Sequence, residues 1–147
     1  MEGFREWLKN MFEIDEQLWT EKMAELSHEK RHEDMDFENL EEILLEMARR
    51  ERREVKNRLA VLILHLLKRQ HYGHTEKSWQ NTIIEQRNQL NDIFLNSQTL
   101  MNYAQVDLPK AYADAVRTAA GETSLPPATF PLTCPWTIQQ ITTHDDT

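Results

Sequence analysis

The segment "LSHEKRHED", residues 26–34, contains H-E-x-x-H, the signature of zinc proteases. That chemistry requires two neutral histidines at i and i+4 on one helix face, a third ligand and a glutamate base. His28 and His32 have the spacing, but Lys30 and Arg31 lie between them. Two cations in that gap would repel zinc and keep the helix solvated. The segment therefore predicts an exposed, charged helix end rather than a zinc site.

Histidines also gather in "HLLKRQHYGH", where His65, His71 and His74 lie near the expected end of a long helix. Imidazole binds transition metals, but no carboxylate or thiol is adjacent to these three residues. Histidine near a helix C-terminus is also favoured by the helix dipole. We therefore expect surface histidines here, and the sequence predicts neither a metal nor any other cofactor.

Arg58 and His65 belong to the constellation that says most about chemistry. With Leu44 and Glu51 they are spaced by seven residues, a spacing that drifts only about 20° per heptad around a helix. The three polar side chains should therefore point the same way as the apolar seam. Buried charges must be paired, so one interpretation is a buried polar ladder with a structural role. The seam consists of Leu40, Leu44, Met47 and Leu62.

The other interpretation is a catalytic pair. The pattern Arg58-x6-His65 resembles the R-x(4–6)-H motif of HEPN ribonucleases, which are all-helical and dimeric. The resemblance implies a metal-independent reaction in which His65 transfers a proton or activates the 2′-hydroxyl, while Arg58 holds the phosphate. Leu59 stands where those motifs usually have a polar residue. Both interpretations stay open at the level of sequence.

The net charge of −8 is unevenly distributed along the chain. Residues 1–46 carry 15 acids and 5 bases, whereas residues 49–69 carry 8 bases and 2 acids. Overall acidity argues against indiscriminate nucleic-acid binding. The basic block has one face that we expect to be solvated. This face could also bind the acidic N-terminal third of this chain or of a partner, or RNA. This face consists of Arg49, Arg52, Arg53 and Lys56.

The composition predicts an all-α fold in a single domain over residues 1–147, because there are only 3 glycines and 29% charged residues among many helix formers. An apolar stripe predicts an N-terminal helical addition at 1–14 that should be buried. A second helix is expected at about 15–30. The longest helix, about 37–72, should begin after the cap Asp36 and form the centre of the bundle. The stripe of the first helix is Phe4, Trp7, Leu8, Met11 and Phe12.

After the long helix, which Gly73 should end, the pattern predicts a helix from about 75 or 78 to 96 and a short one over "TLMNYAQV". Another helix should begin with Asp107 as cap and end at Gly121, with Pro109 in its first turn. The tail, 122–147, holds four prolines in "SLPPATFPLTCPWTIQQI" and should wrap over the bundle as an extended segment with one short helix. Its expected anchors are Phe130 and Trp136, and Pro135 is expected to open the last turn.

The cellular location follows from three further features. A single cysteine, Cys134, excludes an internal disulfide and fits a reducing cytosol. The longest strongly apolar run, 59–67, is far shorter than the roughly 20 residues needed to cross a bilayer. The N-terminus lacks the apolar core of a signal peptide. We expect a soluble cytoplasmic protein that does not enter a membrane.

Several blocks of the sequence resemble an uncharacterised, chiefly cyanobacterial bacterial family, catalogued as domain of unknown function twenty-nine. They are "DFENLEEI", "RRERREVKNRLAVLILHLLKRQ", "SWQNTIIEQR", "AYADAVRTAAGETSLP" and "FPLTCPWTIQQI", in that order between residues 18 and 141. The resemblance implies an all-helical soluble fold and carries no established activity. We therefore expect a non-catalytic interaction or regulatory protein that binds another protein or itself, with the ribonuclease as the alternative.

Overall fold

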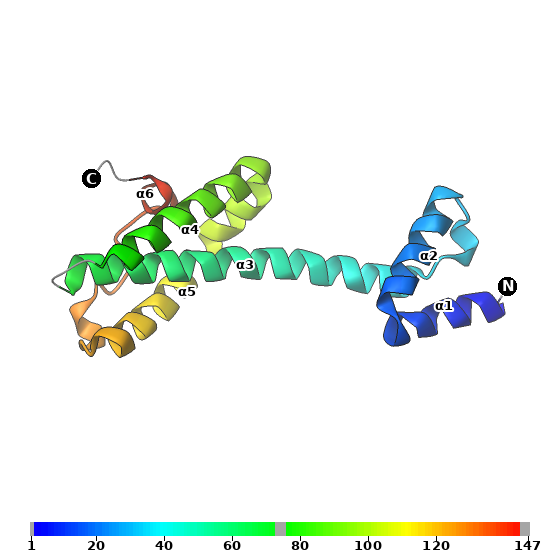
Figure 1. Ribbon diagram of the computed structural model, residues 1–147, viewed down its shortest axis with the longest axis horizontal. Coiled ribbons are helices and arrows are strands. Elements are labelled where there is room, and N and C mark those ends of the chain that lie inside the picture. Colours follow the sequence, from blue (N-terminus) through cyan, green and yellow to red (C-terminus); the bar gives the residue numbers. More distant parts are fainter. Residues whose placement is uncertain (1, 73–75, 145–147) are drawn as a thin grey trace. The chain divides into compact units, whose positions relative to one another are not determined.

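The computed structural model describes residues 2–72 and 76–144, and every regular element within those ranges is a helix (Figure 1). The prediction of an all-α fold is confirmed. The chain forms two compact units, Met1–Arg49 and Arg50–Thr147. The single domain expected over 1–147 stays a prediction, and each unit is described by itself.

The N-terminal unit contains α1 (Glu2–Ile14), α2 (Glu16–His28), the 3₁₀ helix η1 (His32–Asp34) and the first part of α3 (Phe37–His71). Its core is a small cluster to which each of these elements contributes. The predicted burial of the α1 stripe is confirmed for Leu8, whereas Phe4, Met11 and Phe12 are half-buried against the same cluster and Trp7 is 39% exposed. The cluster comprises Leu8, Trp19, Met23, Leu26 and Met35, with Phe4, Met11, Phe12, Leu40 and Ile43 packed against it.

Asp36 joins α2 to the start of α3, as the predicted N-cap. Its Oδ1 accepts a hydrogen bond from the backbone N–H of Asn39 at 3.2 Å. Its Oδ2 accepts from the Nε1–H of Trp19 at 3.0 Å and from the side-chain amide of Asn39 at 2.6 Å. Only 3% of Asp36 is exposed, so these donors take the place of water around a buried polar group.

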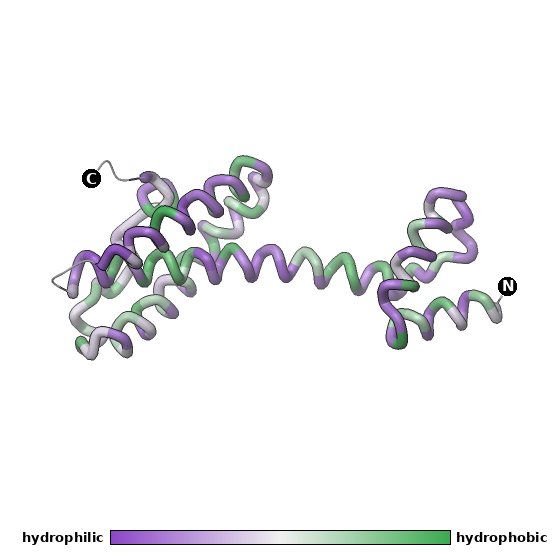
Figure 2. The backbone as a smooth tube through the Cα atoms, in the orientation of Figure 1, coloured by the Kyte–Doolittle hydropathy of each residue, from purple (hydrophilic) through white to green (hydrophobic). Residues whose placement is uncertain are grey.

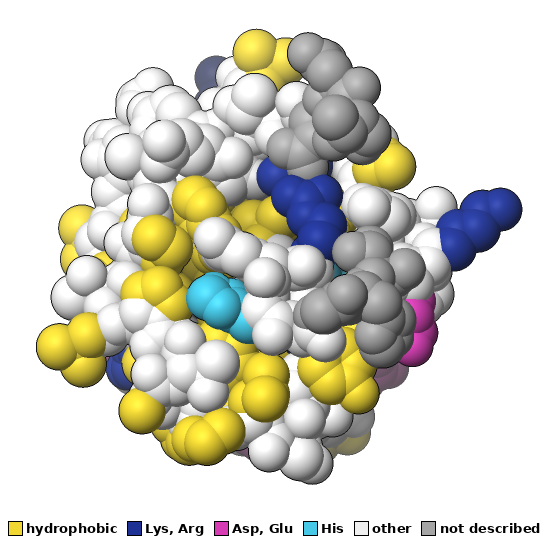
Figure 3. All heavy atoms as spheres, turned by 90° about the vertical axis from the view of Figure 1, so that its left-hand side faces the viewer, with side chains coloured by type: hydrophobic (Ala, Val, Ile, Leu, Met, Phe, Trp, Pro, Cys, Tyr) yellow, Lys and Arg dark blue, Asp and Glu magenta, His cyan; other side chains and the backbone are white. Residues whose placement is uncertain are grey.

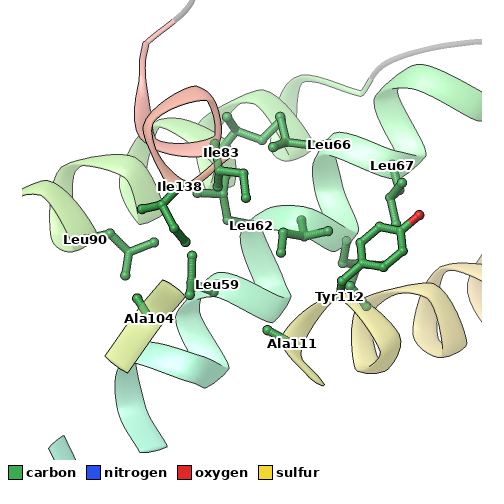
Figure 4. Close-up of a cluster of buried hydrophobic side chains, with 14 of the residues drawn as sticks. Leu59, Leu62, Leu66, Leu67, Ile83, Leu90, Ala104, Ala111, Tyr112 and Ile138 are labelled. Carbon is green, nitrogen blue, oxygen red and sulfur yellow. The ribbon is translucent and has the colours of Figure 1, made fainter. Parts of the chain in front are cut away.

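The C-terminal unit contains the remainder of α3 with α4 (Lys77–Asn96), α5 (Gln98–Thr123), the 3₁₀ helix η2 (Pro127–Thr129) and α6 (Ile138–Thr142). All four α-helices contribute side chains to one core, which Figure 4 shows in close-up. The second half of α3 supplies the largest share of this core, which agrees with the central position expected for the long helix. Its core residues are Val55, Leu59, Leu62, Ile63, Leu64, Leu66 and Leu67.

Two buried cations link the helices of this unit. The Nζ of Lys68 lies 2.8 Å from a carboxylate oxygen of Glu122 and 4.4 Å from the centre of the Trp79 ring, which connects α3 to α5 and α4. The Nε–H of Arg87 donates to the backbone carbonyl of Ile141 at 2.9 Å, which holds α6 against α4. Both cations are less than 9% exposed, and buried charges need such partners.

The predicted break before Asp107 is wrong, because α5 continues through it and contains Pro109 in its interior. Proline removes one backbone donor and usually breaks a helix. Here a row of small residues packs against the core on both sides of Pro109, and tertiary packing outweighs the local preference. That row consists of Ala104, Ala111, Ala115 and Ala119, all buried.

The end of α5 also differs from the prediction. The helix continues through Gly121 to Thr123, and Ser124 takes the left-handed conformation with φ of 60°. The Thr123 hydroxyl donates to the Ala119 carbonyl at 2.7 Å and accepts from the Leu125 N–H at 3.3 Å. These bonds cap the helix end, so the chain turns two residues later than the glycine suggests.

The proline-rich segment after α5 packs on the C-terminal unit, as expected. Phe130 is 4% exposed and Trp136 packs against the same core. The Tyr112 hydroxyl of α5 donates to the Pro131 carbonyl at 2.5 Å. The last helix follows Thr137, which caps it, rather than starting at Pro135. The predicted stop at Gly73 and the last residues, 145–147, lie outside the described part of the chain.

Candidate functional site

The H-E-x-x-H segment does not form one helix. α2 ends at His28, while His32 belongs to η1, and both histidines are exposed. Lys30 between them is left-handed with φ of 59°. The N–H of Arg31 donates to the Leu26 carbonyl at 2.9 Å and that of Lys30 to the Ser27 carbonyl at 3.1 Å. These two bonds make a Schellman end, so the two histidines lack the shared helix face that the protease chemistry requires.

Metal-binding side chains are not grouped in the described residues. No set of three or more His, Cys, Asp or Glu residues among them is placed to hold a metal ion. His71 packs edge-on against Phe130, with ring centres 5.3 Å apart. His74, which the sequence grouped with His65 and His71, lies outside the described part of the chain.

The buried polar ladder predicted on α3 is wrong. Glu51 is exposed, and Arg58 and His65 are only half-buried. The core face of this helix passes instead through Val55, Leu59 and Leu62. Residues seven apart lie on the same side of a helix. Which side of α3 is buried, however, depends on where α4 and α5 pack against it.

Arg58 and His65 make separate local contacts. The Nε–H of Arg58 donates to Glu54 at 3.0 Å, and an Nη–H donates to the Gln86 side chain at 3.2 Å. The Nδ1 of His65 lies 2.8 Å from the carbonyl of Val61, one turn earlier on its own helix. Each group is therefore held by its own neighbours rather than by the other.

Arg58 lines a shallow groove of about 430 Å³ on the C-terminal unit. Arg50 and Arg53 contribute two further guanidinium groups, with Glu54 beside them, and His65 is not part of the lining. The structure therefore brings Arg58 together with other arginines and does not place His65 in the same cavity.

The predicted basic face is divided in the structure. Arg52 forms a bidentate pair with Asp107, with both N···O distances 2.9 Å, and its guanidinium lies 4.2 Å from the centre of the Tyr103 ring. This hydrogen-bonded pair lowers the pKa of Asp107. The sequence did not predict this pair, because it indicated Asp107 as a helix cap. The only signal for an acidic partner was the close succession of four bases on the basic face.

An apolar stripe on the first part of α3 is largely exposed, although the sequence placed Leu44 and Met47, two of its residues, on an inward seam. Phe37 is 53% exposed, Leu44 is 54% exposed and Met47 is 53% exposed. Leu40, in the same line, is half-buried against the N-terminal core. We call these four residues the α3 stripe. Figure 2 shows this hydrophobic start of α3 followed by a hydrophilic stretch and a second hydrophobic one.

A shallow groove of about 490 Å³ runs beside the α3 stripe. It is lined by Phe37, Leu40, Leu44 and Leu45, together with Glu41. Leu45 is 47% exposed. The glutamates between these apolar residues were the signal in the sequence that this part of α3 has a solvated side.

A larger cavity of about 810 Å³ lies between α5 and the proline-rich segment of the C-terminal unit. Its lining includes Leu108, Val116, Phe130 and Leu132, and the thiol of Cys134. Burial raises the pKa of that thiol above its usual value, so the thiol is neutral near pH 7. Figure 3 views the molecule from the end at which α3 finishes, and hydrophobic side chains lie in several groups among other side chains and backbone on that face.

None of the helices within the described ranges is long and apolar enough to cross a membrane.

Comparison with known proteins gives one match. The family model described as "Domain of unknown function DUF29" matches residues 11–145, which is nearly the whole chain. No curated protein matches, and no solved structure matches. The match starts within α1 and includes α2 to α6, so it covers most of both compact units. This all-α chain therefore belongs to the DUF29 family, whose function is uncharacterised.

Proposed function

We propose that this protein is a non-catalytic interaction protein of the bacterial cytoplasm, which binds a protein partner through the α3 stripe. The observation that carries the proposal is the exposure of Phe37, Leu44 and Met47, each just over half exposed on one helix. Contiguous apolar side chains of this size mark an interaction surface more often than an ordinary solvated face.

The free energy available at this surface supports the proposal. Complete burial of a large apolar side chain contributes roughly 1.5–3 kcal/mol. Phe37, Leu44 and Met47 are each just over half exposed. A partner that buried their exposed parts would therefore gain a substantial part of this stabilisation. The groove beside Leu44 and Leu45 gives the partner a concave place to dock.

The geometry around Arg58 and His65 favours a non-catalytic role. Arg58 is bonded to Glu54 and Gln86, and His65 to its own helix backbone. A general base and a phosphate-binding group must reach the same substrate atoms, and these two residues do not line a common cavity.

The single cysteine and the lack of a membrane-crossing helix in the described residues support placing the protein in the cytoplasm.

The test is photo-crosslinking of the full chain in its host cells. A photoreactive phenylalanine analogue replaces Leu44 in one variant and Leu95 in another. Leu95 is 86% exposed on α4 and serves as the matched control for an exposed apolar position away from the stripe. We expect one protein adduct at position 44 that position 95 does not give. Equal adducts at both positions, or none at 44, would contradict the proposal.

A second candidate function is a metal-independent HEPN-like ribonuclease using Arg58 and His65. One observation favours RNA at this place: Arg50, Arg53 and Arg58 share one groove, and guanidinium groups bind phosphates. The test is RNA cleavage in the presence of a chelator. Cleavage by the parent protein that His65→Ala abolishes at unchanged melting temperature would replace the proposal by this candidate.

A further inference from the structure

We infer that the occupant of the α3 stripe is a basic amphipathic helix of a partner protein. The inference rests on the proposed function and adds the chemical class of the partner. Three features of the N-terminal unit carry it: the spacing of the stripe, the charge around it, and the exclusion of other occupants by that charge.

The spacing of the α3 stripe matches a helical partner. Phe37, Leu40, Leu44 and Met47 recur at intervals of three and four residues, so they form a line along one side of α3. A second helix lying along such a line inserts its own apolar side chains between these residues. The groove lined by Phe37, Leu40, Leu44 and Leu45 gives one such insertion point.

The segment that carries the stripe is acidic, and Glu41 is the acid beside the stripe, because the helical spacing places Glu38, Glu42 and Glu46 toward the other side of α3. The segment 37–47 contains four glutamates and no lysine or arginine. Glu38 pairs with Lys9 at 2.7 Å. Glu41 and Glu42 are exposed and form no ion pair with another residue in the described part of the chain. Glu41 also lines the groove, so a partner that covers the stripe brings its own flanking residues against this carboxylate.

A partner with lysine or arginine beside its apolar residues complements this surface. Opposite charges at the rim of an interface raise the association rate and reject partners of the same sign. The N-terminal segment 1–46 has 15 acids and 5 bases, so its long-range field also attracts a basic segment.

The same charge disfavours the other occupants of an apolar helix face. A second copy that paired through this stripe would bring together two N-terminal segments of the same strong negative charge, each with a Glu41 beside the contact, and these repel one another. An anionic lipid surface attracts basic amphipathic helices and repels a segment that contains four glutamates and no lysine or arginine. A partner helix rich in glutamate meets the same repulsion.

The experiment uses the full chain and two synthetic 18-residue peptides with identical leucine stripes at helical spacing. The polar positions are lysine in one peptide and glutamate in the other. Fluorescence anisotropy of the labelled peptides measures the Kd. We expect the lysine peptide to bind at least tenfold more tightly than the glutamate peptide, and its binding to weaken as salt is raised from 50 to 300 mM.

Variants of the protein locate the contact. Leu44→Ser with Met47→Ser should weaken binding of the lysine peptide at least tenfold, while Leu95→Ser on α4 should leave it unchanged. Glu41→Gln should weaken it several-fold and reduce the salt dependence, whereas Glu85→Gln, an exposed glutamate on α4, should not. Circular dichroism of every variant establishes that its helices are intact.

Three outcomes overturn the inference and are distinguishable from failure of the proposed function. If both peptides bind equally and both lose binding to the Leu44 and Met47 double variant, the stripe is a docking surface that has no preference for basic partners. A peptide-free dimer that the double variant dissociates identifies a second copy as the occupant. Binding of the lysine peptide that the double variant does not affect places the contact elsewhere, and absence of the crosslink at position 44 removes the proposed function itself.

Discussion

The polar side chains of this protein act mainly as local connectors, and one residue often serves two elements. Asp36 caps α3 and also accepts the indole N–H of α2. Arg52 of α3 reaches Asp107 of α5 and lies over the Tyr103 ring. Such bonds compensate buried or half-buried polar groups for lost hydration. Removing one partner of such a bond should therefore lower the free energy of unfolding more than removing an exposed polar residue of the same type.

Asp36→Ala tests this at the junction of α2 and α3. The substitution removes an N-cap and leaves the buried indole N–H of Trp19 without its acceptor. We expect a loss of about 1–3 kcal/mol in the free energy of unfolding. Urea unfolding followed by tryptophan fluorescence measures it, and Glu38→Ala, at an exposed position of the same helix turn, is the control. A loss no larger than that of the control would show that the cap contributes little.

Asp107→Asn tests the pair with Arg52 through its pH dependence. The hydrogen bonds from Arg52 lower the pKa of Asp107 below the ordinary value of 3.8. The pair therefore stabilises the folded state above pH 4 or so, and this contribution is lost as the pH falls through the lowered pKa. We expect the variant to melt below the parent at pH 7, with a difference that shrinks toward pH 2. A difference that is constant from pH 7 to pH 2 would contradict this origin.

At the scale of elements, helix ends follow local chemistry and helix interiors follow packing. The cap at Asp36, the left-handed turn at Lys30 and the cap at Thr137 are each explained by their own few residues. By contrast, α5 continues through Pro109 because buried alanines on both sides of it pack against the core. A proline signal is therefore reliable only where no such packing opposes it.

Lys30→Gly tests the Schellman end of α2. Lys30 has φ of 59°, a conformation that is unfavourable for residues with a Cβ and that glycine adopts without strain. We expect the variant to gain about 1 kcal/mol in the free energy of unfolding, measured by urea unfolding. Lys22→Gly, in the interior of α2, should lose stability by a similar amount. If both substitutions destabilise, the left-handed end of α2 does not form in solution.

At the scale of the whole molecule, each compact unit has its own hydrophobic core. Leu8 and Trp19 belong to the N-terminal cluster, and Leu59 and Leu62 to the C-terminal one. All four are almost completely buried, with at most 2% exposed. A cavity made in one core removes contacts from that unit's own cluster, so its first effect should be local.

Leu8→Ala and Leu59→Ala test this separation. Each replaces a fully buried leucine and should cost about 2–5 kcal/mol in the unit that contains it. Hydrogen exchange should increase in α1 and α2 for Leu8→Ala, and in α4 and α5 for Leu59→Ala. Exchange that rises equally in all four helices after either substitution would show that the two units open as one.

The sequence by itself determined the secondary structure of this protein to within a few residues at most helix ends. The bounds of α3 and α4, the cap at Asp36, and the extended segment anchored by Phe130 all agree with it. These features depend on interactions between residues close in the chain, namely apolar periodicity, capping and proline geometry. Local interactions can be read in sequence because their partners are a few positions away.

Only the tertiary structure decided which faces of the helices are covered. The sequence placed Leu44 and Met47 with Glu51, Arg58 and His65 on an inward line, whereas Leu44, Met47 and Glu51 are exposed and Arg58 and His65 are half-buried. Likewise, aspartate is a common helix cap, which made Asp107 a predicted cap, but in the structure Asp107 binds Arg52, which is 55 residues earlier. A helical repeat defines a line of residues but not the element that packs against it. That choice depends on distant segments, whose positions only the folded chain determines.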